Sequence, residues 1–113
     1  MSDQSETSRR IQELQLLEHN HQALLMQKQT IQLELNEVLN AHEEVSRASG
    51  SVYRVLGGIM MQAEKDNVLK DLQEKKKMLE IRVSTIEKQE KIIDDKISSI
   101  KKEITATVGK NKQ

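Results

Sequence analysis

Three histidines, His19, His21 and His42, are the side chains best suited to bind a metal or transfer a proton at neutral pH. Positions two residues apart on a helix point to different sides, so His19 and His21 cannot act together. His42 lies several turns further along, whereas zinc needs about four converging ligands. The sequence also lacks cysteine. We therefore expect packed or solvated histidines, with no metal and no other cofactor.

Other patterns that would indicate catalysis or nucleotide binding are also missing. Gly57-Gly58 is not part of a G-x-x-x-x-G-K-[ST] phosphate loop. The basic run at 75–77 has the acidic neighbours Asp71, Glu74 and Glu80, which favours a solvated helix face. The formal net charge is zero, which argues against nucleic-acid binding. Since no catalytic set lies in a predicted cleft, we expect a protein that is not an enzyme.

The composition favours long helices over a compact globule. Of 113 residues, 32% are charged, there is no proline, phenylalanine or tryptophan, and Tyr53 is the single aromatic residue. Aromatic side chains supply much of the burial in globular cores. A narrow apolar seam between helices suits this composition better. Disorder is the other interpretation of a polar chain, but periodic apolar residues favour helices.

The N-terminal segment MSDQSETSRR has no apolar core of the kind found in signal peptides. No window of the sequence approaches the roughly 20 apolar residues that span a bilayer. We expect a soluble, cytoplasmic protein that binds no membrane.

Two segments carry a coiled-coil pattern, in which steps of three and four residues alternate. The first seam is mostly apolar and consists of Leu14, Leu17, His21, Leu24, Lys28, Ile31, Leu35, Val38, His42 and Val45. The second consists of Leu69, Leu72, Lys76, Leu79, Val83, Ile86, Glu90, Ile93, Ile97, Ile100 and Ile104. Neither segment contains proline or glycine, so two long helices are predicted.

The first helix is expected over about 8–47. Hydroxyls at Ser5–Ser8 offer N-caps, and Gly50 can take a positive φ beyond the helix end.

The second helix is expected over about 66–108. Asp66 or Asn67 is the expected cap, and the helix is expected to fray near Gly109.

The two helices are predicted to pair antiparallel within one chain, because they flank a chain reversal. With the turn at Gly57-Gly58, partner residue numbers sum to about 115. Lys28 then lies near Glu87 and Glu90, which would place opposite charges together at awkward seam positions.

The middle segment, 51–64, is predicted to be a β-hairpin, because two central glycines favour a two-residue turn with positive φ. A two-stranded hairpin is marginal in water and has two free edges. The chain offers no third strand, so we expect hairpins of several chains to pair. The simpler alternative is a reversal loop, although about 2–8 residues suffice for that. The residues assigned to assembly are Val52, Tyr53, Val55, Leu56, Gly57, Gly58, Ile59, Met60 and Met61.

The sequence resembles the β-class subunits of prefoldin, a hexameric molecular chaperone. The similarity runs from about Arg10 to Ile104. It rests on QKQTIQLELNEVLNAHEEV (27–45) and on the tract that opens with VYRVLGGIMMQ and continues to Ile93. The VYRVLGG motif between two equal helical arms is its most specific part. The α-class subunits carry two hairpins, whereas only one fits here.

The resemblance implies one prefoldin-like domain over 1–113 and assembly with α-class and other β-class subunits through a double β-barrel. It also implies that unfolded clients are held at the open tips without ATP and passed to a group II cytosolic chaperonin. The residues expected to contact clients lie near the start of the first helix and the end of the second, namely Ile11, Leu14, Leu16, Leu17, Ile97, Ile100 and Ile104.

Two functions remain open from the residues themselves. A holdase needs exposed apolar groups near the open ends, and splaying of the seam there would supply them. A structural tether within a larger complex would be packed to its ends, with no apolar residue off the seam. Ile11, Leu16 and Ile92 lie off the seam and favour the holdase.

Overall fold

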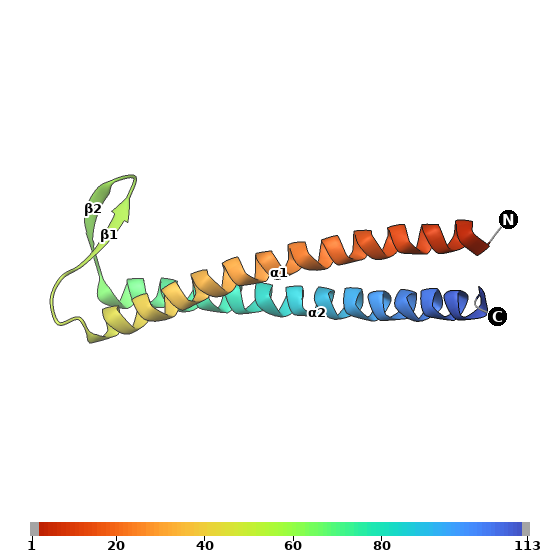
Figure 1. Ribbon diagram of the computed structural model, residues 1–113. Helices are drawn as coiled ribbons and strands as arrows, with labels where there is room; N and C mark the ends of the chain where they lie inside the picture. Colours follow the sequence, from red (N-terminus) through yellow and green to blue (C-terminus); the bar gives the residue numbers. More distant parts are fainter. Residues whose placement is uncertain (1–2, 112–113) are drawn as a thin grey trace. The chain divides into compact units, whose positions relative to one another are not determined.

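The computed structural model describes residues 3–111, including the side chains of residues 5–109. Two long helices, α1 (Asp3–Arg47) and α2 (Lys65–Asn111), flank the strands β1 (Val52–Leu56) and β2 (Ile59–Ala63) (Figure 1). The predicted fold of two helices joined by one hairpin is thus confirmed. No helix in the described part of the chain is long and apolar enough to cross a membrane.

Helix α1 begins at Asp3, earlier than the predicted start near Ser8. No proline or glycine in this segment opposes the helix, and Glu6 in its first turn is favoured at the positive end of the helix dipole.

The end of α1 at Arg47 is not capped by a left-handed glycine, as the sequence suggested, because Gly50 does not have a positive φ. Instead the Ala48 N–H donates to the Val45 carbonyl at 3.1 Å. The Lys65 ammonium donates to the carbonyls of Ser46 at 3.0 Å and Ala48 at 2.9 Å. A cation therefore satisfies carbonyls at the negative end of the helix.

Helix α2 begins at Lys65, which makes Glu64 its N-cap, so the predicted cap at Asp66 or Asn67 is wrong by two or three residues. The Glu64 carbonyl accepts the first helical hydrogen bond, from the Val68 N–H at 3.0 Å. Asp66 lies inside the first turn, where its charge is favoured by the helix dipole.

At its other end α2 continues to Asn111, past the fraying expected at Gly109. The hydroxyls of Thr105 and Thr107 each donate to the carbonyl four residues earlier, at 2.9 Å. Both hydroxyls are therefore hydrogen-bonded within their own helix, in the i−4 pattern that threonine adopts inside helices.

The hairpin is antiparallel, with Val52 opposite Ala63 and Leu56 opposite Ile59. Gly57 and Gly58 have φ of 55° and 81°, as a type I′ turn requires. The strands are one residue shorter at each outer end than the predicted 51–64 segment.

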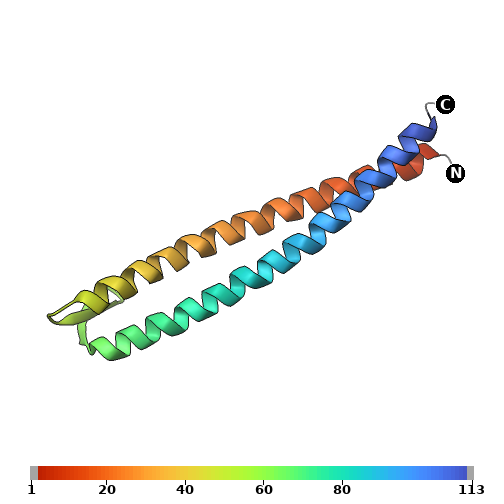
Figure 2. The ribbon, with the colours of Figure 1, turned by 90° about the horizontal axis from the view of Figure 1, so that it is seen from below.

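The chain divides into two compact units, each built from parts of both helices. Unit 1 comprises residues 1–28 and 85–113, and unit 2 comprises residues 29–84. In unit 1, α1 and α2 run antiparallel, with the first turns of α1 beside the last turns of α2 (Figures 1 and 2). Unit 2 holds the hairpin and the helical segments that flank it.

The core of each unit is the predicted seam. Every seam position of both helices is buried or half-buried. The most deeply buried side chains are Ile86 and Ile100 in unit 1 and Ile31, Val38 and Leu79 in unit 2. The heptad pattern is therefore confirmed in both units.

Candidate functional site

The hairpin of unit 2 presents two faces, which follow from its register. Residues directly opposite each other share a face, and successive residues alternate. The face directed toward α2, called the inner face, carries Val52, Arg54, Leu56, Ile59, Met61 and Ala63. The opposite face, called the outer face, carries Tyr53, Val55, Met60 and Gln62.

Both faces of the hairpin expose large apolar side chains. Tyr53, Val55, Leu56, Ile59, Met60 and Met61 are between 52% and 68% exposed. The sheet has two strands, so each strand also has an edge without a neighbouring strand. Such a surface is a template for pairing with another chain.

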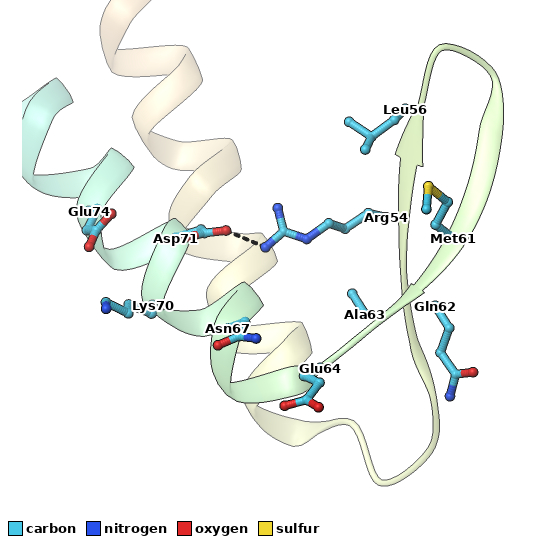
Figure 3. A pocket seen from close by; sticks show the side chains of 10 residues that line it. All are labelled: Arg54, Leu56, Met61, Gln62, Ala63, Glu64, Asn67, Lys70, Asp71 and Glu74. Carbon is cyan, nitrogen blue, oxygen red and sulfur yellow. Dashed lines mark hydrogen bonds and ion pairs between the residues drawn. The ribbon is translucent and has the colours of Figure 1, made fainter.

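A groove of about 500 Å³ lies between the inner face and α2 (Figure 3). Its walls include Leu56, Met61 and Ala63 from the hairpin, and Asn67 and Glu74 from α2. Arg54 points from β1 across this groove, and its guanidinium donates to the Asp71 carboxylate (Figure 3).

The second candidate site is the end of unit 1 where both helices terminate. Ile11 and Leu16 are exposed there, Leu16 at 60%. Ile92 and Val108 are exposed in the same unit. The three apolar side chains predicted off the seam, Ile11, Leu16 and Ile92, are thus accessible to a partner.

The seam residues at this end are not splayed apart, contrary to the expectation. Ile100 is only 8% exposed. The other four are half-buried, namely Leu14, Leu17, Ile97 and Ile104. Arg10 joins the helices here, since it donates to the Thr107 hydroxyl at 3.1 Å and pairs with Glu103 at 3.3 Å.

Polar side chains interrupt the seam of unit 1 in the predicted register. Lys28 Nζ lies 3.1 Å from Glu90 Oε1 and 3.7 Å from Glu87 Oε2, which confirms the expected pairing. Glu90 Oε1 is buried and accepts no hydrogen bond of suitable geometry. Its contact with the Lys28 ammonium is therefore an ion pair. The close side-chain contact with Glu90 raises the pKa of Lys28 above 10.5; desolvation opposes the shift, and the charges of Glu90 and Glu87 add to it.

The histidines were expected at the seam or in solvent. His21 is half-buried, with Nε2 3.0 Å from Asp94 Oδ1, and His42 is half-buried in unit 2. Within residues 3–111 no three metal-ligating side chains of His, Cys, Asp or Glu converge.

Two contacts of unit 2 were missed by the sequence reasoning, the Lys65 cap and the Arg54–Asp71 pair. The sequence signal for the Arg54–Asp71 pair was a single cation inside an otherwise uncharged strand, VYRVL. The Lys65 cap left no distinctive sequence pattern, because lysine is frequent throughout α2.

Comparison with known proteins gives a consistent result. The family described as "Prefoldin subunit" matches residues 8–111. Prefoldin subunit beta of Saccharolobus islandicus strain L.S.2.15 is 30% identical over 107 residues, covering 93% of this chain and 85% of the relative. Prefoldin subunit beta of Pyrococcus furiosus is 30% identical over 98 residues, covering 85% of this chain and 84% of the relative.

Solved structures show the same fold. The crystal structure of the prefoldin beta subunit from Thermococcus strain KS-1 aligns with a TM-score of 0.85 and 28% identity, covering 89% of this chain and 90% of that chain. The prefoldin beta2 subunit from the same strain aligns with a TM-score of 0.69 and 17% identity, covering 77% of this chain and 95% of that chain. This second similarity supports the fold alone. With two long helices, one glycine-turned hairpin and a family match along nearly its whole length, the chain belongs to the prefoldin family as a β-class subunit of this chaperone.

Proposed function

We propose that this subunit is an ATP-independent holdase, which captures unfolded proteins and passes them to a group II cytosolic chaperonin. It acts within a cytoplasmic hetero-hexamer of α-class and β-class subunits, joined through their hairpins in a β-barrel. The protein is not an enzyme, and binding alone carries its function.

The exposed hairpin supports the assembly part of the proposal. Six large apolar side chains on its two faces have no cover in the single chain. Full burial of an aliphatic side chain contributes roughly 1.5–3 kcal/mol, so covering this surface by other subunits would stabilise an oligomer.

The helix ends of unit 1 support the client-binding part. Ile11 and Leu16 are exposed beside the seam, where diffuse apolar surface suits an unfolded chain. The seam residues Leu14, Leu17, Ile97, Ile100 and Ile104 can join this surface only when the helix ends separate. Weak contacts repeated over several arms would give avidity with easy release.

A decisive experiment replaces Ile11 and Leu16 with serine in the assembled complex. Both residues are exposed, at 41% and 60%, and lie outside the hairpin, so the oligomer should persist, while suppression of aggregation of a chemically denatured enzyme should fall severalfold. Light scattering at near-stoichiometric ratio measures the suppression, and native mass spectrometry measures the oligomer. The matched control is Leu33→Ser with Leu39→Ser, two exposed apolar residues of unit 2. Equal loss in both variants would contradict a client site at the helix ends.

A structural tether is the second candidate. The closed seam at the end of unit 1 favours it, because Arg10 joins the two helices and Ile100 is buried there. A tether predicts that the unmodified complex does not suppress aggregation at any ratio tested.

A further inference from the structure

Arg54 is the one charged residue in the two strands of the hairpin, VYRVL and IMMQA. It lies on the inner face, between the outer pair Val52–Ala63 and the turn pair Leu56–Ile59. An arginine is costly in a surface that other chains must cover, since burying an unpaired charge is unfavourable. Its position therefore requires a partner of opposite charge.

That partner is Asp71, which lies in the second turn of α2 (Figure 3). The groove around it also contains Glu64 and Glu74, against the single further cation Lys70. Arg54 therefore faces a surface with an acidic excess, and it spans the groove between the sheet and the helix. The pair is 39% and 55% exposed, so it remains sensitive to salt.

Two chain connections join the base of the hairpin to the helices. On one side residues 48–51 lie between α1 and β1. On the other side only Glu64 separates β2 from α2. The Lys65 ammonium donates hydrogen bonds to the carbonyls of Ser46 and Ala48, which links the start of α2 to the end of α1 at the base of the hairpin. The Arg54–Asp71 pair joins the hairpin itself to α2 above this base.

We propose that Arg54 and Asp71 are a positioning pair, which sets the angle of the hairpin on α2 and thereby the geometry in which the subunit enters its oligomer. The inference rests on the proposed assembly through the hairpin. The apolar residues supply the association energy, and the ion pair selects the direction in which they are presented. Loss of the pair would leave the same apolar surface on a hairpin with a wider range of orientations.

Charge reversal with reciprocal rescue tests the proposal. Arg54→Asp places a carboxylate opposite Asp71, and Arg54→Asp with Asp71→Arg restores opposite charges in the reverse order. We expect the single reversal to weaken assembly with an α-class partner by about 3- to 10-fold at low salt, and the reciprocal variant to restore most of it. Native mass spectrometry of mixed subunits gives the assembled fraction. Lys75→Glu is the matched control, because Lys75 and Glu34 form an exposed pair 3.4 Å apart that does not involve the hairpin.

A second readout measures the hairpin angle directly. The chain contains no cysteine, so Gln62→Cys and Lys77→Cys provide two unique positions for spin labels. Double electron–electron resonance on the full-length chain should give a broader distance distribution for Arg54→Asp than for the chain with Arg54 and Asp71 unchanged, and the reciprocal variant should narrow it again. A structural effect on helix stability alone would not follow charge complementarity in this way.

An unchanged distance distribution in Arg54→Asp would overturn the proposal, as would full assembly by that variant. Loss of assembly without recovery in the reciprocal variant would also contradict it. Failure of the proposed assembly is a separate result, because the unmodified chain would then show no oligomer through its hairpin.

Discussion

Lys28 illustrates how one polar residue in an apolar seam specifies the pairing of two helices. Its ammonium meets Glu87 and Glu90, and a shift of one heptad would leave Glu90 without this partner. The net stability of such pairs is often small, because desolvation offsets the attraction. We therefore assign Lys28 to selection of register rather than to stability.

The raised pKa of Lys28 leads to a prediction about alkaline pH. A group whose pKa is higher in the folded chain contributes stability that is complete below 10.5 and is lost as pH rises through the folded value. The melting temperature of the unmodified chain should therefore fall more steeply above pH 10.5 than that of Lys28→Met. Circular dichroism melts between about pH 8 and about pH 12 measure the difference.

Lys75→Met removes one exposed lysine from unit 2 and controls for the change in net charge. If Lys28→Met and Lys75→Met show the same alkaline profile, the contact with Glu90 does not carry the effect.

At the scale of the element, the turn of the hairpin depends on its backbone. Gly57 and Gly58 have positive φ, and a Cβ at either position would meet no atom within 4 Å. Substitution is therefore opposed by conformation, not by crowding. An L-residue in the left-handed region costs roughly 1–2 kcal/mol, and more when it is β-branched.

We expect Gly57→Val with Gly58→Val to abolish assembly while the far-ultraviolet helical signal persists. Two strained turn residues exceed what a marginal two-stranded sheet can tolerate. Gly57→Asn is the control, because Asn-Gly is a preferred type I′ sequence and should assemble normally. Native mass spectrometry distinguishes the variants. Normal assembly by the valine variant would show that the oligomer does not need this turn.

At the scale of the whole molecule, the isolated chain keeps an apolar hairpin in water. Its sheet has two strands and exposed side chains on both faces. Backbone hydrogen bonds in such a sheet open easily, because little burial opposes the opening.

Amide hydrogen exchange should therefore distinguish the free chain from the assembled complex. We expect residues 52–63 to exchange at least roughly tenfold faster in a monomer than in the oligomer, because other subunits cover the sheet there. The buried seam residues Ile31, Val38 and Leu79 provide an internal reference in unit 2. Strong protection of the hairpin in a proven monomer would contradict assembly as its purpose.

Much of the fold was determined by the sequence itself, because its signals are local and periodic. The three-four spacing predicted every seam position, and paired glycines predicted the turn. The antiparallel register followed from these two features and placed Lys28 beside Glu87 and Glu90. The assignment of assembly to the hairpin and of client binding to the helix ends remains a prediction from residue type and resemblance.

The tertiary structure decided which polar side chains meet across the elements. The Lys65 cap, the Arg54–Asp71 pair and the Arg10 link each join residues at least 17 positions apart. The structure also decided that the helix ends of unit 1 are closed, with Ile100 buried. Periodicity assigns a residue to a face of its own helix or strand, but a long flexible side chain has several neighbours within reach. Only the placement of those elements in space determines which carbonyl or carboxylate it binds.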